Sequence, residues 1–348
     1  MKTYLALDGG GTKLAAILFD SELRKLGACV SGSIRANTTP APERQANMAA
    51  VIKKLALEGR EIEVAGGHVE KEFIDEIRKI ACIRKVRTVG EADVALAAAG
   101  VFGDGILTIA GTGSTTFVRL GSVTEALGGY GNLVSDEGSG YWIGRKALTA
   151  AIHDFEGRGP STALTELIAR EISGNKTGRE EFRNAVFMMY GEGRRSPAST
   201  VAGLTQVVVK AAAQGDGIAR DILNEAGRLQ AEQVIASVNM FRVPPEVPVV
   251  LAGSVWRSNP VYFAAFCGKL REILPEKEVI VPEFEPVMGF PLRLYREMRG
   301  NGAEGAEGAG NAGNAADAEG AGKYREMIGR LKREFPEFVY DINAEKHR

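Results

Sequence analysis

The chain has 348 residues, enough for two domains with buried cores, and its hydrophobic and charged fractions, 45% and 25%, are those of an ordinary globular protein. A formal net charge of -1 argues against charge-driven binding to nucleic acid or to an anionic membrane. Three cysteines, Cys29, Cys82 and Cys267, lie too far apart for a zinc or disulfide framework. Because no signal-peptide pattern and no apolar run of roughly 18 residues occurs, we expect a cytoplasmic protein that binds neither membrane nor nucleic acid.

A glycine turn between two apolar runs is the first candidate binding element. Residues 3–7 and 14–19 predict a β-hairpin, and the turn between them reads Asp-Gly-Gly-Gly-Thr-Lys (8–13). Backbone N–H groups of such a turn can face phosphate oxygens, Thr12 can donate a hydrogen bond, and Asp8 can hold magnesium through water. The spacing is neither that of a P-loop nor that of the dinucleotide fingerprint.

A second strand, glycine turn and strand follow later in the chain. Residues 105–110 and 115–120 predict the two strands, and Gly-Thr-Gly-Ser (111–114) is the turn that joins them. Either turn alone could be no more than the tip of a hairpin. The two turns together favour the binding of a nucleotide through its polyphosphate.

The glycine-rich stretch 128–144 is the third candidate element. It contains the adjacent carboxylates Asp136 and Glu137 and the aromatic residues Tyr130 and Trp142. Because glycine is costly inside helices and strands, the stretch predicts a loop, and the apolar sequence after it predicts a helix. Such a loop suits a polar ligand that needs close backbone approach and hydrogen-bond acceptors. A plain surface loop followed by a capped helix is the alternative.

Strand-like and helix-like segments alternate through the body of the chain, which predicts an α/β fold. Further predicted helices cover residues 42–57, 70–80 and 92–100, with mostly helical sequence from 144 to 233. Further predicted strands cover residues 63–65, 85–89, 247–252 and 278–281.

The C-terminal part of the chain has a different composition. Residues 300–322 contain only Gly, Ala, Asn, Glu and Asp, so they cannot build a core and predict a flexible linker. Apolar spacing returns after them, and residues 323–348 predict a terminal amphipathic helix. We expect this helix to dock onto the body of the protein, with binding of a partner as the alternative.

Four separated motifs occur in the order that one family shows. They are D-G-G-G-T-K (8–13), G-T-G-S (111–114), the 128–144 stretch and G-S-V-W-R-S (253–258), with secondary matches at 213–216 and 285–289. On these motifs the chain resembles the acetate-and-sugar-kinase/Hsp70/actin superfamily, and within it the N-acetylglucosamine kinases and the BadF/BadG/BcrA/BcrD ATPases. The resemblance implies two ribonuclease-H-like (actin-like) lobes, residues 1–118 and 119–299, which close over ATP and substrate. It also implies a homodimer.

The resemblance further implies roles for individual residues. Those implied for ATP and Mg²⁺ are Asp8 (the metal residue), Gly10, Gly11, Thr12, Lys13, Gly111, Thr112, Gly113, Asp216, Gly253, Ser254 and Ser258. Those implied for the sugar are Asn37, Gly67, Ser114, Gly129, Tyr130 and Asp136. Tyr130 could instead be a core residue, and for Trp142 we favour the core.

The chain departs from the family pattern at two places on the substrate side. The family usually carries N-D-A-x-x-A-L, whose aspartate is the expected base, whereas this chain reads G-E-A-D-V-A-L (90–96) and places Glu91 there. Asp93 is a rival, but on a helix it points about 200° away from Glu91. Asp136 is the other candidate for catalysis. The family's S-G-G sugar loop reads Ala-Gly-Gly (65–67) and lacks a hydroxyl.

The resemblance implies an ATP-dependent kinase that phosphorylates the primary hydroxyl of an amino sugar, with N-acetylglucosamine as the first candidate. One alternative is an ATPase that activates 2-hydroxyacyl-CoA dehydratases. Dimers of those activators clamp an iron–sulfur cluster with two cysteines per subunit, a spacing that this chain lacks. A non-catalytic sugar sensor of the same fold is the other alternative.

Overall fold

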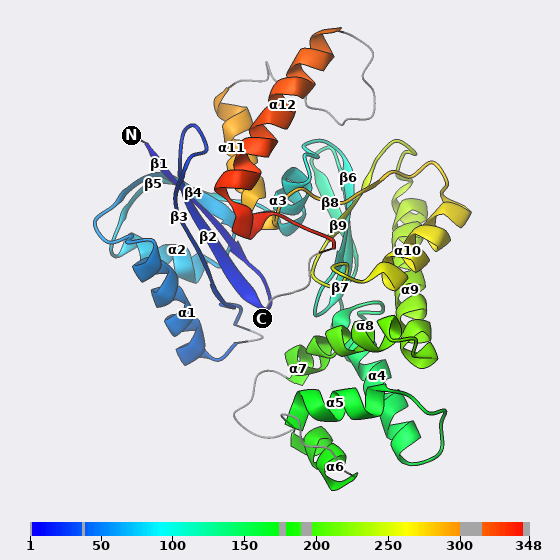
Figure 1. Cartoon of the computed structure of the whole chain (residues 1–348). Coiled ribbons are helices and arrows are strands. Elements are labelled where there is room, and N and C mark those ends of the chain that lie inside the picture. The colour runs from blue at the N-terminus through cyan, green and yellow to red at the C-terminus, as the bar shows by residue number, and fades with distance from the viewer. Residues whose placement is uncertain (1, 37–38, 174–178, 189–196, 300–314, 344–348) are drawn as a thin grey trace. The chain divides into compact units, whose positions relative to one another are not determined.

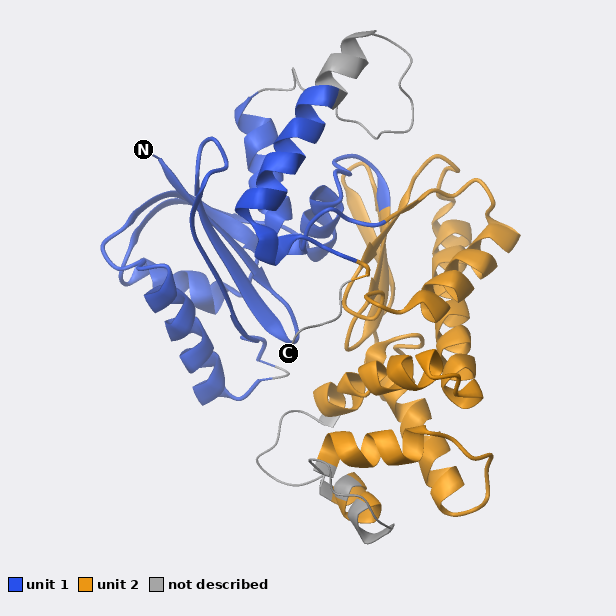
Figure 2. Ribbon diagram, in the orientation of Figure 1, with its two compact units in different colours: residues 1–105, 281–341 blue, residues 106–280, 342–348 orange. Residues whose placement is uncertain are grey.

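The computed structural model of the chain describes residues 2–36, 39–173, 179–188, 197–299 and 315–343 (Figure 1). The chain divides into two compact units, unit 1 (residues 1–105 and 281–341) and unit 2 (residues 106–280 and 342–348), which Figure 2 distinguishes by colour. Each unit has its own five-stranded sheet with helices packed on it. The predicted α/β architecture of two lobes is therefore confirmed.

The sheet of unit 1 has the strand order β3-β2-β1-β4-β5. Its strands are β1 (Thr3–Gly9), β2 (Lys13–Asp20), β3 (Lys25–Gly32), β4 (Glu61–His68) and β5 (Cys82–Thr88). Its helices are α1 (Ala41–Lys54), α2 (Lys71–Arg78), α3 (Glu91–Ala98), α11 (Gly289–Met298) and α12 (Ala315–Glu334), with short 3-10 helices at Pro286–Met288 and Pro336–Phe338. β1 pairs antiparallel with β2, while β4 runs parallel to both β1 and β5.

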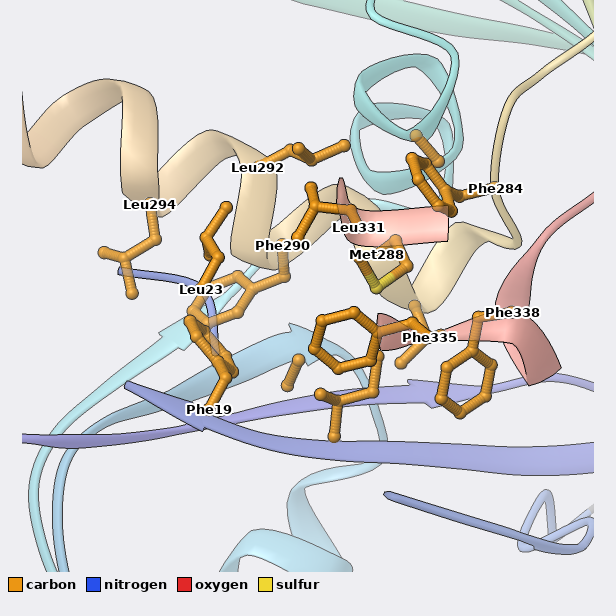
Figure 3. Close-up of a cluster of buried hydrophobic side chains, with 14 of the residues drawn as sticks. Phe19, Leu23, Phe284, Met288, Phe290, Leu292, Leu294, Leu331, Phe335 and Phe338 are labelled. Carbon is orange, nitrogen blue, oxygen red and sulfur yellow. The ribbon is translucent and has the colours of Figure 1, made fainter. Parts of the chain in front are cut away.

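Two apolar clusters form the core of unit 1, one on each face of its sheet. Along β1, Tyr4 and Ala6 join one cluster and Leu5 and Leu7 join the other, as the two-residue period of a strand requires. The second cluster includes buried side chains of α1 and α2. In the first cluster, side chains of β2, α11 and α12 meet, as the labelled residues in Figure 3 show. We call this first cluster the α12 cluster.

The sheet of unit 2 has the strand order β10-β9-β6-β7-β8. Its strands are β6 (Gly105–Ala110), β7 (Ser114–Leu120), β8 (Val123–Gly128), β9 (Val249–Ala252) and β10 (Val279–Ile280). Its helices are α4 (Gly140–Phe155), α5 (Leu164–Ser173), α6 (Arg179–Met188), α7 (Pro197–Gly203), α8 (Thr205–Ala213), α9 (Gly217–Phe241) and α10 (Pro260–Ile273). No helix among the described segments combines the length and apolar character needed to cross a membrane.

The structure divides the chain at other points than the predicted boundaries at residues 118 and 299. Strand β6 pairs in parallel with β9, so both β6 and β7 belong to the sheet of unit 2. Conversely, Phe290 and Leu292 of α11 lie in the α12 cluster, and the segment from residue 281 onward belongs to unit 1. Local sequence patterns did not reveal these boundaries because pairing and packing between distant segments decide them.

The C-terminal helix is part of the core of unit 1. Helix α12 begins at Ala315, inside the predicted linker, and residues 300–314 of that linker lie outside the described residues. Ile328 and Leu331 of α12 are buried in the α12 cluster. The predicted docking of this helix onto the body is confirmed. Strands β3 and β8 and helices α10 and α11 were not predicted.

We expect Leu331→Ala to lower the free energy of unfolding by about 2–5 kcal/mol, because Leu331 is fully buried and its truncation leaves a cavity. Urea unfolding of the full chain measures the change. Glu326→Ala on the exposed face of the same helix is the matched control and should change stability by roughly 0.5 kcal/mol or less. Equal effects of the two substitutions would contradict a docked helix.

Candidate active site

The predicted site residues of unit 1 that the structure describes come together at one edge of its sheet. Strands β1, β4 and β5 are parallel, so their carboxyl ends meet at that edge. Asp8 at the end of β1 is paired with His68 at the end of β4, and Gly67 is paired with Thr88 at the end of β5. The chain then enters α3 at Glu91. Residues from three segments of the chain are thereby brought together.

The first glycine turn joins β1 and β2 at the same edge, as the predicted hairpin requires. The Gly10 N–H group donates to the Lys13 carbonyl at 2.8 Å and closes the turn. Gly11 and Thr12 at its tip are exposed, and a Cβ at Gly11 would meet nothing within 4 Å. The tip of the turn is thus exposed to solvent, as a phosphate-binding turn must be.

An ion pair holds the lysine of the first turn. Lys13 Nζ lies 3.0 Å from Glu285 Oε2, and Glu285 is almost completely buried. Glu285 opens the E-P-V-M-G motif, to which the sequence analysis assigned no role. The contact could not be found from local patterns, because the two residues are far apart in the chain and meet only through the fold.

The carboxyl group of Asp8 is unusual among the acids of this edge. Burial raises the pKa of Asp8 to about 7, although the positive charges of Lys13 and Arg35 favour its ionised form, and Glu91 raises it further. Near neutral pH the carboxyl group is therefore divided between its two protonation states. A bound cation would stabilise the ionised form, so this residue fits a magnesium position.

The structure separates the two rival carboxylates of the G-E-A-D-V-A-L motif. Glu91 is the first residue of α3, where the helix dipole favours a negative charge. Its Oε2 atom lies 3.7 Å from Arg35 Nη2 and 4.0 Å from His68 Nε2. Asp93, in the same turn of α3, instead lies 3.4 Å from Arg293 Nη1. Glu91 therefore faces the edge that carries Asp8, and Asp93 has a different set of partners.

Arg35 and His68 were not among the predicted site residues. Burial lowers the pKa of His68 below its ordinary value against the opposing effect of Glu91, and Arg35 lowers it further. The imidazole is therefore neutral at physiological pH. For His68 the only signal in the sequence was a polar residue shortly after the predicted strand 63–65, which is common in loops. No strand was predicted before Arg35, so no local pattern marked that residue.

Unit 2 repeats this arrangement with its own sheet. β6 and β9 are parallel, so the Gly111–Gly113 turn after β6 and the turn at Gly253 after β9 lie at the same edge. The Gly111 N–H group donates to the Gly113 carbonyl at 2.9 Å. Gly253 has a φ of 99°, and a Cβ there would lie 2.3 Å from the Ala110 carbonyl oxygen. This position therefore requires glycine, and Ser254 follows it in the same turn.

Asp136 lies against the second glycine turn. A Cβ at Gly113 would come within 2.7 Å of Asp136 Oδ2, so the carboxylate occupies the space beside that glycine. Burial raises the pKa of Asp136 above its ordinary value, although backbone hydrogen bonds from Ser114 and Gly131 favour the ionised form. Asp136 also has a φ of 65°, a conformation that costs energy in a residue other than glycine and is frequent at functional sites.

Helix α4 begins on the second glycine turn. The N–H group of Gly140 donates to the Gly111 carbonyl at 2.8 Å, and that of Tyr141 donates to the Thr112 carbonyl at 3.1 Å. Ser139 caps this helix by accepting from the Trp142 N–H group. The first N–H groups of α4 thus bind the carbonyls of the turn and hold it in place.

Side chains of the 128–144 stretch divide between surface and interior. Trp142 is buried, as favoured, whereas Tyr130 is 78% exposed and is not a core residue. The Ser114 hydroxyl donates to the Glu137 carbonyl at 2.8 Å, so it holds the loop. A Cβ at Gly129 would lie 2.4 Å from Thr115 Oγ1, which explains the glycine by close packing.

Asp216 has a structural role in unit 2. It caps helix α9 by accepting from the Ala219 N–H group at 2.8 Å, and it also accepts from the Ala163 N–H group and from the Thr162 hydroxyl. Burial by itself would raise the pKa of Asp216, but these hydrogen bonds together hold it below its ordinary value. Its carboxylate is therefore occupied by protein donors.

Contacts within the protein account for two further predicted residues, and a third lies outside the described residues. Gly67 lies within β4 between two strands, where a Cβ would come within 2.1 Å of the Leu7 carbonyl oxygen, so sheet packing explains this glycine. Ser258 donates from its N–H group to the Ile342 carbonyl at 2.6 Å and from its hydroxyl to the Asn343 carbonyl at 3.0 Å. Asn37 lies outside the described residues.

The described residues contain no group of three or more His, Cys, Asp or Glu side chains arranged to hold a metal ion. Mg²⁺ bound with a nucleotide commonly uses one or two carboxylates together with the phosphates, so a single residue such as Asp8 suffices. The cysteines do not form a cluster-binding pair. Cys29 is half-buried in β3, Cys82 is exposed in β5, and Cys267 is buried in α10 of the other unit.

Comparisons with known proteins agree with this geometry. The chain is 28% identical over 305 residues to the N-acetylmuramic acid/N-acetylglucosamine kinase of Clostridium acetobutylicum, covering 83% of this chain and 97% of that protein. It is 26% identical over 192 residues to the N-acetyl-D-glucosamine kinase of Dictyostelium discoideum, covering 54% and 58%. The fold is similar to that of a proposed N-acetylglucosamine kinase from Chromobacterium violaceum, with a TM-score of 0.63, 20% identity, and coverage of 85% and 99%.

A family model provides the broadest match. It spans residues 5–290, which include both glycine turns, the 128–144 stretch and the E-P-V-M-G motif. The match confirms the resemblance drawn from the motifs and covers most of both units. The chain belongs to the BadF/BadG/BcrA/BcrD ATPase family.

Proposed function

We propose that this protein is an ATP-dependent kinase that phosphorylates the primary hydroxyl of an amino sugar, with N-acetylglucosamine as the first candidate. The observation that carries the proposal is the carboxyl edge of unit 1, where an open glycine turn, Asp8 and Glu91 lie together. The likeness to sugar kinases over 97% of one relative supports the same activity. ATP as the nucleotide follows from the family itself. From the family resemblance we also propose a cytoplasmic homodimer.

Phosphoryl transfer asks the protein for alignment and charge neutralisation more than for covalent chemistry. Mg²⁺, when bound, would neutralise phosphate charge, and Asp8 is the residue that would hold it. The exposed tip of the first glycine turn, Gly11 and Thr12, would bind phosphate oxygens, with Lys13 beside it. We also propose the turns at Gly111–Gly113 and Gly253 of unit 2 as nucleotide-binding residues, as the family resemblance implies.

Glu91 is the group proposed to orient the sugar hydroxyl and to accept its proton. Its side chain is 37% exposed, so a substrate can reach it, and two basic side chains stand beside it. Asp136 of the second unit is proposed to accept hydrogen bonds from the sugar, and it is the second candidate for the base. Its buried carboxylate and strained backbone are typical of a functional position.

The two alternative functions make different demands on the chain. An activator of 2-hydroxyacyl-CoA dehydratases needs a cysteine pair at a cluster, and the positions of the three cysteines do not favour this. A non-catalytic sugar sensor needs no base. Turnover of ATP only in the presence of a sugar, by protein free of iron, would exclude both.

We expect Glu91→Gln to lower kcat for sugar phosphorylation by about 10²–10⁴-fold, because the amide cannot accept a proton. ADP release with Mg-ATP and a panel of amino sugars and hexoses measures this. Asp93→Asn is the matched control on the same helix and should keep most of the activity, since Asp93 pairs with Arg293. Full activity of Glu91→Gln would assign the role of base to Asp136 instead. Absence of ADP release by the wild-type protein with every sugar of the panel would reject the proposed kinase activity.

We expect Asp136→Asn to stabilise the protein at pH 8 but not at pH 4. Because folding raises the pKa of Asp136, the stability that this group contributes is present at low pH and is lost as the pH rises through its folded-state value. The neutral asparagine avoids this loss and tolerates the left-handed backbone. Urea unfolding across the pH range measures the difference, with exposed Glu125→Gln as the control. A difference that does not vary with pH would contradict the prediction.

We expect Asp216→Ala to reduce the free energy of unfolding by about 1–2 kcal/mol through loss of the helix cap, with KM for Mg-ATP nearly unchanged. The structural reason is that Asp216 already accepts three hydrogen bonds from protein donors. Thermal unfolding and initial-rate kinetics on the same preparation measure both effects. A large rise of KM with no change in stability would instead assign Asp216 to the nucleotide.

A further inference from the structure

Arg35 lies at the edge of unit 1 that carries the first glycine turn. It follows β3, whose last residue Gly32 is paired with Lys13 at the end of that turn. The Arg35 backbone N–H group donates to Ser33 Oγ at 3.1 Å, and the Ser33 hydroxyl donates to the Gly10 carbonyl at 2.9 Å. Arg35 is therefore tied through its own backbone to the turn proposed to bind phosphate.

The Arg35 side chain makes a second connection to the same turn. Its Nε atom donates to the Gly9 carbonyl at 3.3 Å, which leaves the outer end of the guanidinium pointing toward other partners. There Nη2 lies 2.9 Å from His68 Nε2 and 3.7 Å from Glu91 Oε2. One planar group thus links the glycine turn, the histidine and the proposed base.

The chemistry of arginine determines the direction of the contact with His68. Arginine has no hydrogen-bond acceptor, so His68 Nε2 must accept, and the ring proton is on Nδ1. A backbone hydrogen bond with Val89 also holds the ring. The neutral imidazole therefore orients the guanidinium. Because it carries no negative charge, it does not compete with the Glu91 carboxylate for the positive charge of Arg35.

We propose that Arg35, oriented by His68, is a positioning residue that holds the Glu91 carboxylate in register with the first glycine turn. The inference rests on the proposed function, since it assigns to Glu91 the role of base. Glutamate has one more rotatable bond than the aspartate usual in the family. Without a restraint, its carboxylate would therefore populate unproductive orientations more often. The pair is partly exposed, so it contributes orientation more than stability.

The test is a double-mutant cycle on the full-length protein with Arg35→Gln, Glu91→Gln and the double variant. Arg35→Gln should lower kcat about 30-fold while KM for Mg-ATP changes by about threefold or less. In the Glu91→Gln background the same change should have little further effect, because the group that Arg35 positions is already lost. Arg35→Lys keeps the positive charge but loses the planar guanidinium geometry, so its kcat should lie between those of Arg35→Gln and the wild-type protein.

His68 is tested by two substitutions of different chemistry. His68→Gln places an oxygen that can accept from Arg35 and should retain most of kcat, whereas His68→Leu cannot accept and should lower kcat about tenfold. Arg84→Gln is the matched control. Arg84 forms an ion pair with Glu61 at 3.3 Å near the opposite ends of β4 and β5, so its loss should leave kcat and KM unchanged.

Additive effects of Arg35→Gln and Glu91→Gln on kcat would overturn the inference, as would an effect of Arg35→Gln that appears only in KM for Mg-ATP. Absence of sugar phosphorylation by the wild-type protein would instead reject the proposed function. In that case the same four proteins, compared by urea unfolding, decide the inference. Coupled shifts of the unfolding midpoints support a restraint of Glu91 by Arg35, and additive shifts reject it.

Discussion

Parallel strand pairing is the constraint on which the rest of this structure depends. In unit 1, the pairing of β1 with β4 and of β4 with β5 brings three strand ends to one edge. Asp8, His68 and the entry to α3 stand there for that reason alone. In unit 2, the pairing of β6 with β9 brings the second glycine turn beside Gly253 in the same way. At these edges neighbouring main chains also approach each other closely. This close packing explains glycines there without any contact to a ligand.

Charge at the edge of unit 1 is arranged in connected pairs. Lys13 is held by Glu285, which comes from a distant segment, and Arg35 stands between the glycine turn and Glu91. Only Asp8 is left with a strongly raised pKa, because burial there outweighs the two nearby cations. A further positive charge beside Asp8 would favour the ionised form of its carboxyl group and offset the effect of burial. The arrangement is therefore suited to a phosphate ligand that arrives with its own metal ion.

Both units place a glycine turn at the carboxyl edge of their sheet, but the surrounding side chains differ. Unit 1 combines an exposed turn with charged side chains, while unit 2 anchors its turn to the first N–H groups of α4 and places a buried, strained carboxylate beside it. The C-terminal helix α12 completes the core of unit 1, so a segment that follows a low-complexity stretch contributes buried side chains to that unit. Among the described residues other than glycine, left-handed backbone conformations occur in loops and turns.

The sequence by itself determined the local elements. The two hairpins with glycine tips, the 128–144 loop followed by a helix, the buried strand before Gly253 and the family all followed from residue types and their spacing. Those features are local, because hairpin turns and helix starts depend on neighbouring residues. The roles of Glu91 and Asp136 remain proposals.

Only the tertiary structure decided which segments share a sheet and which charges meet. It assigned β6 and β7 to unit 2 and α11 and α12 to unit 1, and it showed that Asp216, an expected nucleotide contact, caps helix α9. It also brought Arg35 to Glu91 and Glu285 to Lys13. Such contacts join residues distant in the chain, and their energies depend on burial and geometry, which no local pattern of residues specifies.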